Sequence, residues 1–152
     1  MTKLNIFLGM LLLLGTASGQ NLVANGDFES GYNNGWHPLE GGGSAVYSEE
    51  TGNPYEGARA LKVQVNTLGG NSWDVQTLGP NISLTVGEEY SLTCWARAAT
   101  AGTSVRMILQ NGLYRSHDSS LGTDWAQYTW TFTAEEPSPQ LKMHYFETGT
   151  LW

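Results

Sequence analysis

Charged residues are scarce in this chain of 152 residues, where they make up 14% against a usual ~25%. Lysine and arginine together number only seven, against fourteen aspartates and glutamates, for a net charge of −7. These cations are scattered singly, whereas a phosphate-binding surface needs them clustered, which argues against nucleic acid as a partner. Because 40% of the residues are still hydrophobic and 11% are aromatic, the chain can bury enough apolar surface to fold.

Cysteine and the usual catalytic motifs are also nearly absent. The single Cys94 cannot form an intramolecular disulfide, and its strand-like surroundings indicate a small core residue. The sequence contains no G-x-S-x-G elbow, phosphate-binding loop, H-E-x-x-H motif or cysteine spacing typical of zinc sites. Asp74 and Glu147 are acids beside aromatic residues, but they are too weak a pair to predict the two carboxylates of a glycosidase. We therefore expect no catalysis.

Only one long hydrophobic run occurs, at residues 6–14, and it is shorter than the ~20 residues that span a bilayer. Lys3 precedes this run, and Ala17-Ser18-Gly19 follows it as a small-residue cleavage site. That arrangement is typical of a secretory signal peptide. We expect residues 1–19 to be this peptide, residues 20–152 to be one secreted domain, and no membrane partner.

The predicted domain is all-β. No helical spacing of apolar residues persists, whereas alternating segments bounded by Gly, Pro, Asn or Asp recur. Strands are expected at residues 60–65, 90–96, 105–109, 128–133 and 141–146, with turns between them such as Gly79-Pro80-Asn81. In the last strand Leu141, Met143 and Tyr145 form an apolar face, so His144 points to the opposite face. A two-sheet β-sandwich jelly roll is the predicted architecture.

Tryptophan and tyrosine occur in polar, amide-rich contexts in two segments, residues 71–76 and 110–115. Sugars stack their C–H faces on aromatic rings, while their hydroxyls need fixed hydrogen-bonding partners. These segments therefore favour a glycan-binding site. From the residues alone, Trp73 could equally be a core residue, and Tyr114 and Arg115 could simply anchor a loop.

Several segments, taken in order, resemble the family 4, 9 and 22 carbohydrate-binding modules. They are residues 21–31 with Gly35-Trp36, residues 56–63, residues 71–75, residues 90–98 and residues 125–133. The Trp73 segment and His144 most resemble the xylan-binding family 4 modules of secreted bacterial xylanases. The resemblance covers nearly all of residues 20–152.

The resemblance implies an open cleft that binds one β-1,4-linked polysaccharide chain, xylan and/or β-glucan, without catalysis. The module would target an attached glycoside hydrolase to this substrate. Trp73 and Tyr114 match stacking aromatics, Gln76 matches a hydroxyl-binding glutamate position, Arg115 lies near a hydrogen-bonding arginine, and His144 matches a cleft histidine. Trp73 and Gln76 are three residues apart, so on one strand their side chains would point to opposite faces. Both reach one cleft only if Trp73 lies on a loop. An unperturbed His144, with a pKa near ~6.5, would make binding pH-dependent.

The resemblance also implies a structural calcium site that uses Asp27 and Glu29 with backbone carbonyls. From the residues alone, these two acids could simply be polar groups of a surface turn. A further calcium-binding aspartate would lie on a final strand after Trp152, which the sequence does not include. We therefore interpret the chain as C-terminally truncated, a fragment of a longer secreted enzyme.

Two other functions stay open at this point. A small secreted glycoside hydrolase is compatible with the expected fold, provided that two carboxylates face each other in one cleft. A surface adhesion domain without a glycan cleft is the other alternative, because jelly rolls serve many functions.

Overall fold

The computed structural model describes residues 21–152, so the predicted signal peptide at residues 1–19 lies outside the described residues. In the described part, no helix is long and apolar enough to cross a membrane. The strands there are β1 His37–Glu40, β2 Ser44–Glu50, β3 Ala60–Thr67, β4 Val75–Asn81, β5 Glu89–Ala96, β6 Thr103–Gln110, β7 Tyr114–Leu121, β8 Ala126–Thr133, β9 Gln140–Tyr145 and β10 Gly149–Leu151.

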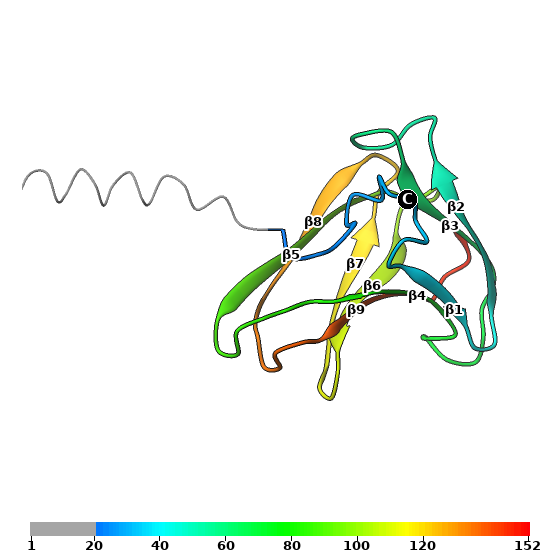
Figure 1. The fold of residues 1–152 in the computed structure, drawn as a ribbon. Coiled ribbons are helices and arrows are strands. Elements are labelled where there is room, and N and C mark those ends of the chain that lie inside the picture. The colour runs from blue at the N-terminus through cyan, green and yellow to red at the C-terminus, as the bar shows by residue number, and fades with distance from the viewer. Residues whose placement is uncertain (1–20) are drawn as a thin grey trace, which may run out of the picture.

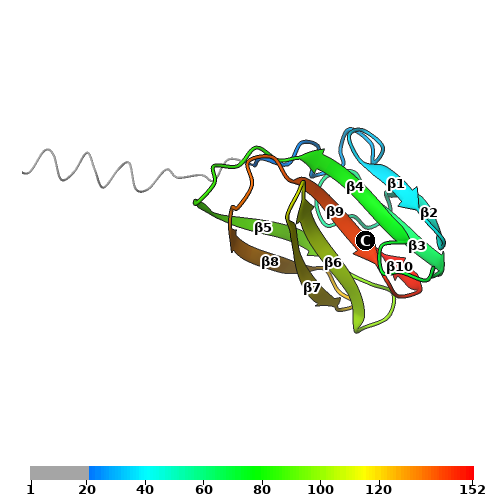
Figure 2. The same ribbon diagram turned by 90° about the horizontal axis from the view of Figure 1, so that it is seen from below.

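The strands form two layers (Figures 1 and 2). One layer is a five-stranded antiparallel sheet in the order β1-β4-β9-β6-β7. The other consists of the three-stranded sheet β10-β3-β2 and the pair β5-β8. These two parts are joined where Arg97 and Trp152 exchange backbone hydrogen bonds of 3.0 Å in both directions. The prediction of an all-β, two-sheet sandwich is confirmed.

The core lies between the layers and follows the period-2 alternation of the strands. Inward-facing residues of β3, β6 and β9 are buried, among them Val63, Val65, Val105, Met107 and Leu141. Strand β8 keeps its threonines exposed and its aromatic residues half-buried. The five predicted strands correspond to β3, β5, β6, β8 and β9, and the predicted orientation of His144 away from the core is also confirmed.

The predicted turn at Gly79-Pro80-Asn81 is wrong, because these residues belong to β4. Gly and Pro mark an irregularity here, since the pairing of β4 with β9 shifts register between Leu78 and Asn81. Gly79 also packs under Trp36, and a Cβ on Gly79 would lie 2.7 Å from the indole ring. Trp36, at 4% exposure, is part of the core.

The N-terminal segment, residues 21–36, is held by one asparagine. Asn25 adopts a positive φ of 49°, and its side-chain amide donates to the carbonyls of Gly31 and Asn34 at 2.9 Å each. The backbone carbonyl of Asn25 accepts a hydrogen bond from the Trp36 indole at 3.1 Å. Residues 21–36 therefore fold into a compact turn that holds Trp36 in the core.

Candidate functional site

The five-stranded sheet has one face toward the core and one face away from it. Directly opposed residues of antiparallel strands point to the same face, so the strand register defines three rows on the face away from the core. The rows are Leu39, Gln76, His144, Arg106 and Asp118; His37, Leu78, Lys142, Ile108 and Ser116; and Asn81, Gln140, Gln110 and Tyr114. We call these rows the outer face; Figure 2 shows its strands side by side.

Three of the five residues predicted to bind sugar, Gln76, His144 and Tyr114, lie on the outer face. Trp73 lies on the loop that leads into β4, and at 54% exposure it is not a core residue. Its carbonyl accepts a hydrogen bond of 2.7 Å from the side-chain amide of Gln76. The loop position therefore removes the conflict of strand parity and ties Trp73 to the edge of the outer face.

Asp74 organises the loop that carries Trp73. Its carboxylate accepts a 2.9 Å hydrogen bond from the backbone N–H of Asn71, and its carbonyl accepts a 2.8 Å bond from the N–H of Gly41. A Cβ on Gly69 would clash with the same carboxylate, so the loop needs glycine there. Asp74 is 6% exposed and is therefore occupied in holding the loop.

A bidentate ion pair lies on the outer face, between β6 and the edge strand β7. The guanidinium of Arg106 donates to both carboxylate oxygens of Asp118, at 2.6 and 2.8 Å. Arg106 lowers the pKa of Asp118, while Asp118, and after it Tyr114, raise the pKa of Arg106. Arg106 also lies over the Phe146 ring, 5.2 Å from its centroid. Asp118 is the one carboxylate in the three rows, so the rows contain no facing pair for glycoside hydrolysis.

His144 is 4% exposed, although it points away from the core. Burial, followed by the nearby charges of Lys142 and Arg106, lowers its pKa to about 4. The sequence-based expectation of a pKa near ~6.5 therefore does not hold, because that value applies to a solvated imidazole. His144 is neutral at pH 7, and its Nδ1 atom has no hydrogen-bonding partner among the described residues. This nitrogen is itself buried.

Arg115 lies on the other face of β7, because neighbouring residues of a strand point in opposite directions. It is opposite the core residue Leu109, and its guanidinium pairs with Glu135. The structure therefore separates Arg115 from the other four predicted residues. Arg106, which sequence reasoning missed, is the arginine on the outer face.

The turn before Tyr114 is held by the carboxylate of Glu136. The Glu136 carboxylate accepts hydrogen bonds from the backbone N–H groups of Asn111 and Gly112, at 2.8 and 2.9 Å. It accepts a third, of 3.3 Å, from Leu113. Glu136 thereby fixes the start of β7 and the position of Tyr114.

Asp27 and Glu29, the predicted calcium ligands, make hydrogen bonds within the protein. Asp27 accepts the N–H of Glu29 at 3.3 Å, and Glu29 accepts the N–H groups of Ala58 and Arg59 at 2.9 and 3.1 Å. Calcium takes 6–8 oxygen ligands, and residues 21–152 contain no cluster of three or more metal-ligating side chains. Calcium binding by Asp27, Glu29 and backbone carbonyls stays a prediction.

These features are those of a ligand-binding β-sandwich with a polar, aromatic-edged sheet face. The family model described as "Carbohydrate binding domain" matches residues 20–151. The chain therefore belongs to this family of carbohydrate-binding domains, and the resemblance to such modules is confirmed.

Solved structures share the jelly-roll fold. A CBM4 structure is 21% identical, with a TM-score of 0.65 over 85% of this chain and 93% of its own. The CBM22-1 xylan-binding domain of Xyn10C from Paenibacillus barcinonensis is 13% identical, with a TM-score of 0.56 over 82% and 83%. TmCBM61, solved with β-1,4-galactotriose, is 13% identical, with a TM-score of 0.59 over 88% and 92%. No curated protein matches the sequence significantly.

Proposed function

We propose that the outer face binds a single chain of β-1,4-linked polysaccharide, xylan and/or β-glucan. The observation that carries this proposal is the convergence of Gln76, His144 and Tyr114 on one sheet face, with the exposed Trp73 at its edge. Trp73 and Tyr114 would stack on sugar rings, and the amide and imidazole between them would bind hydroxyls.

The dimensions of the face suit a chain rather than a single sugar. Gln76 and Tyr114 lie three strands apart and two rows apart, and each row is two residues from the next along a strand. At about 4.8 Å per strand and about 3.3 Å per residue, their Cα atoms are roughly 19 Å apart on the diagonal. Trp73 precedes Gln76 on the loop before β4, on the side of Gln76 away from Tyr114. An oligosaccharide of several residues can therefore reach from Trp73 to Tyr114.

The polar groups of the face are held in place before any ligand arrives. Lys142 donates to the side-chain oxygen of Gln110 at 3.0 Å, and Arg106 is fixed by Asp118. Groups that are already ordered lose less conformational entropy on binding. The Arg106–Asp118 pair contributes no net charge, which suits a neutral polysaccharide.

We further propose that the domain is secreted and works beside a covalently attached glycoside hydrolase. Binding to the polymer would raise the effective concentration of that enzyme at its substrate. The predicted signal peptide supports export, and the family supports binding to polysaccharide. The xylan-binding description of the CBM22-1 domain is compatible with xylan as the ligand.

The test is affinity electrophoresis of the purified domain, residues 20–152, in gels that contain xylan or mixed-linkage β-glucan. Retardation is expected in at least one gel, together with background release of reducing sugar from the same polymers. Release of sugar by the purified domain would favour the glycoside hydrolase alternative. Unretarded migration in every gel would favour the adhesion domain without a glycan site.

A further inference from the structure

The domain has few basic side chains, and most of them already have a partner. Of the seven lysines and arginines, all but Lys3 lie among the described residues, together with all fourteen acids. Five of these six have an acid or an aromatic ring as partner: Arg59, Arg106 and Arg115 in ion pairs, and Lys62 and Arg97 over the indole of Trp152. Lys142 has neither within residues 21–152, and its ammonium donates to the neutral side chain of Gln110 at 3.0 Å.

Lys142 stands at the centre of the outer face. It belongs to β9, the middle strand of the five-stranded sheet (Figure 2), and to the middle one of the three rows. Its partner Gln110 is directly opposite Tyr114 in the pairing of β6 with β7. The ammonium therefore lies beside the diagonal from Trp73 to Tyr114, which is the path proposed for the polysaccharide.

The surroundings of Lys142 leave its positive charge uncompensated. Asp118, the acid of the outer face, is bound by Arg106, and Glu136, beside the turn after β6, accepts three backbone N–H groups. The three rows contain two basic residues and one acid, a net charge of +1. The described part as a whole, with six basic against fourteen acidic side chains, has a net charge of −8. The outer face is therefore positive within an acidic domain.

Lys142 and Gln110 present two hydrogen-bond donors side by side. Because the amide oxygen of Gln110 accepts from Lys142, the amide nitrogen of the same group lies next to the ammonium and can donate as well. A carboxylate has two acceptor oxygens and makes its strongest hydrogen bonds with charged donors. Lys142 is also half-buried, and a partly buried ion pair is screened less by salt than an exposed one. The two side chains are therefore suited to binding one carboxylate.

We propose that Lys142 and Gln110 bind a carboxylate of the polysaccharide, so that the outer face recognises a chain that carries uronic-acid side groups. This inference rests on the proposed function and names the class of ligand within it. Xylose has no carboxyl group, so on a xylan chain the carboxylate belongs to a side group and the backbone stays neutral. One ammonium neutralises one carboxylate, and the net charge of the domain would repel a polymer charged on every sugar. The ligand therefore carries its acid groups sparsely.

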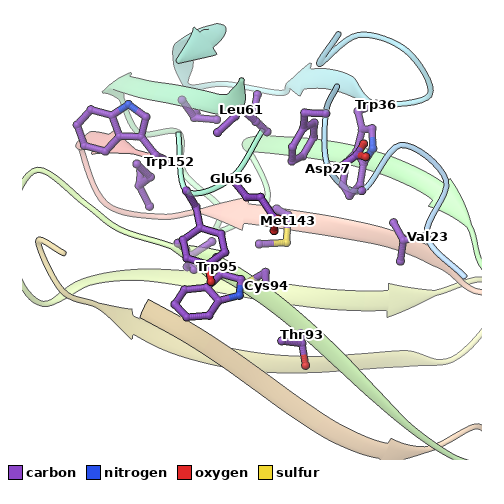
Figure 3. Close-up of a pocket in the computed structure, with 18 of the residues that line it drawn as sticks. Val23, Asp27, Trp36, Glu56, Leu61, Thr93, Cys94, Trp95, Met143 and Trp152 are labelled. Carbon is purple, nitrogen blue, oxygen red and sulfur yellow. The ribbon is translucent and has the colours of Figure 1, made fainter. Parts of the chain in front are cut away.

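The apolar pocket between the two layers does not suit such a group. Apolar residues such as Leu61 line it, together with the acids Asp27 and Glu56 (Figure 3). Arg59 also lines it, but this arginine is paired with Glu49. A carboxylate would lose its hydration there and would face charges of its own sign. We therefore assign the carboxylate to the outer face.

Isothermal titration of the domain, residues 20–152, with three related ligands tests this inference. The ligands are xylohexaose, xylohexaose that carries one glucuronic acid on an inner xylose, and the carboxyl-reduced form of the second ligand, which lacks only the charge. At low salt the uronate ligand should bind about fivefold more tightly than its reduced form, as expected for one partly exposed ion pair. At high salt this preference should fall below about twofold. Xylohexaose has no carboxylate, so its affinity should depend little on salt.

Variants of the basic residues locate the carboxylate. Lys142→Gln should remove the preference for the uronate ligand, whereas Lys142→Arg should keep it. Lys62→Gln is the matched control, because it removes the same charge from β3 in the other layer, and it should keep the preference. Circular dichroism checks that the variants fold, and the comparison of ligands on the wild type stays decisive if Lys142→Gln does not fold.

Equal affinity of the wild type for the uronate ligand and its reduced form, with both of them bound, would overturn this inference and leave the polysaccharide site intact. A preference that persists in Lys142→Gln would overturn it as well, because another group would then bind the carboxylate. Failure of all three ligands to bind would refute the proposed function, and this inference with it.

Discussion

Replacing Trp73 by alanine removes the most exposed aromatic ring beside the outer face. A tryptophan side chain has about 250 Å² of surface, and Trp73 keeps 54% of its surface in solvent, or about 135 Å². A sugar stacked on one side of the ring would cover roughly half of that area. At about 25 cal/mol per Å², the lost burial corresponds to about 1.7 kcal/mol, and the Kd should rise about 15-fold.

Isothermal titration with xylohexaose measures this change, and urea unfolding measures stability beside it. Because Trp73 is largely exposed, the free energy of unfolding should change by no more than about 0.5 kcal/mol. Leu68→Ala is the matched control, since Leu68 is 45% exposed near the same loop, and its affinity should equal that of the wild type. An unchanged affinity of Trp73→Ala would refute the stacking role, and a large loss of stability would refute the loop geometry.

Three further predictions concern charges. Between pH 6.5 and 4, the free energy of unfolding should fall by up to about 3 kcal/mol more in the wild type than in His144→Gln. The reason is that the imidazole of the unfolded chain takes up a proton near pH ~6.5, whereas that of the folded protein does so only near about 4. Equal pH slopes of the two proteins in urea melts would contradict this. Glu136→Gln should lower the free energy of unfolding by about 1 kcal/mol and weaken retardation in xylan gels, because the turn before Tyr114 loosens. Glu135→Gln breaks only the exposed pair with Arg115 and should leave retardation unchanged. Affinity should change less than about twofold between low and high salt, because stacking and neutral hydrogen bonds are not screened; a steep decrease in titrations would show that ion pairs dominate.

Strands with a clear alternation could be predicted from the sequence. Residues 128–133 alternate aromatic residues and threonines because one side of β8 faces the core and the other faces water. Strand β7 could not be predicted in this way, because its inward positions include His117 and Ser119 as well as Leu121. Strand β1 is exposed along its whole length, so its sequence does not show the alternation of apolar and polar residues that packing against a core produces.

Residues of the site could be predicted only where the sequence showed which side chains of a strand point toward the core and which point away from it. His144 stands between core residues of a recognisable strand, and this position alone placed it on the outer face. Arg106 carried the same signal, at an outward position between Val105 and Met107, but its partner Asp118 is identified only by the β6–β7 register. The resemblance places Arg115 in the same site as its neighbour Tyr114, but adjacent residues of a strand point to opposite faces, so the two side chains are separated.

The lowered pKa of His144 depends on contacts that the sequence does not reveal. Burial at the outer face and the charges of Lys142 and Arg106 lower it together. Lys142 is on the same strand, but Arg106 comes from β6, which pairs with β9. A titration near neutral pH was a reasonable expectation for a solvated histidine, and the three-dimensional surroundings removed it.

The most direct test of the polysaccharide site is a map of bound ligand by NMR. Backbone amide shifts of the ¹⁵N-labelled domain, residues 20–152, would be followed during titration with xylohexaose and with a β-glucan oligosaccharide. We expect the largest changes in β4, β9, β6 and β7 around Gln76, His144 and Tyr114, and small changes in β5 and β8. Changes concentrated in β5 and β8, with the outer face unaffected, would contradict the assignment of the outer face as the polysaccharide site.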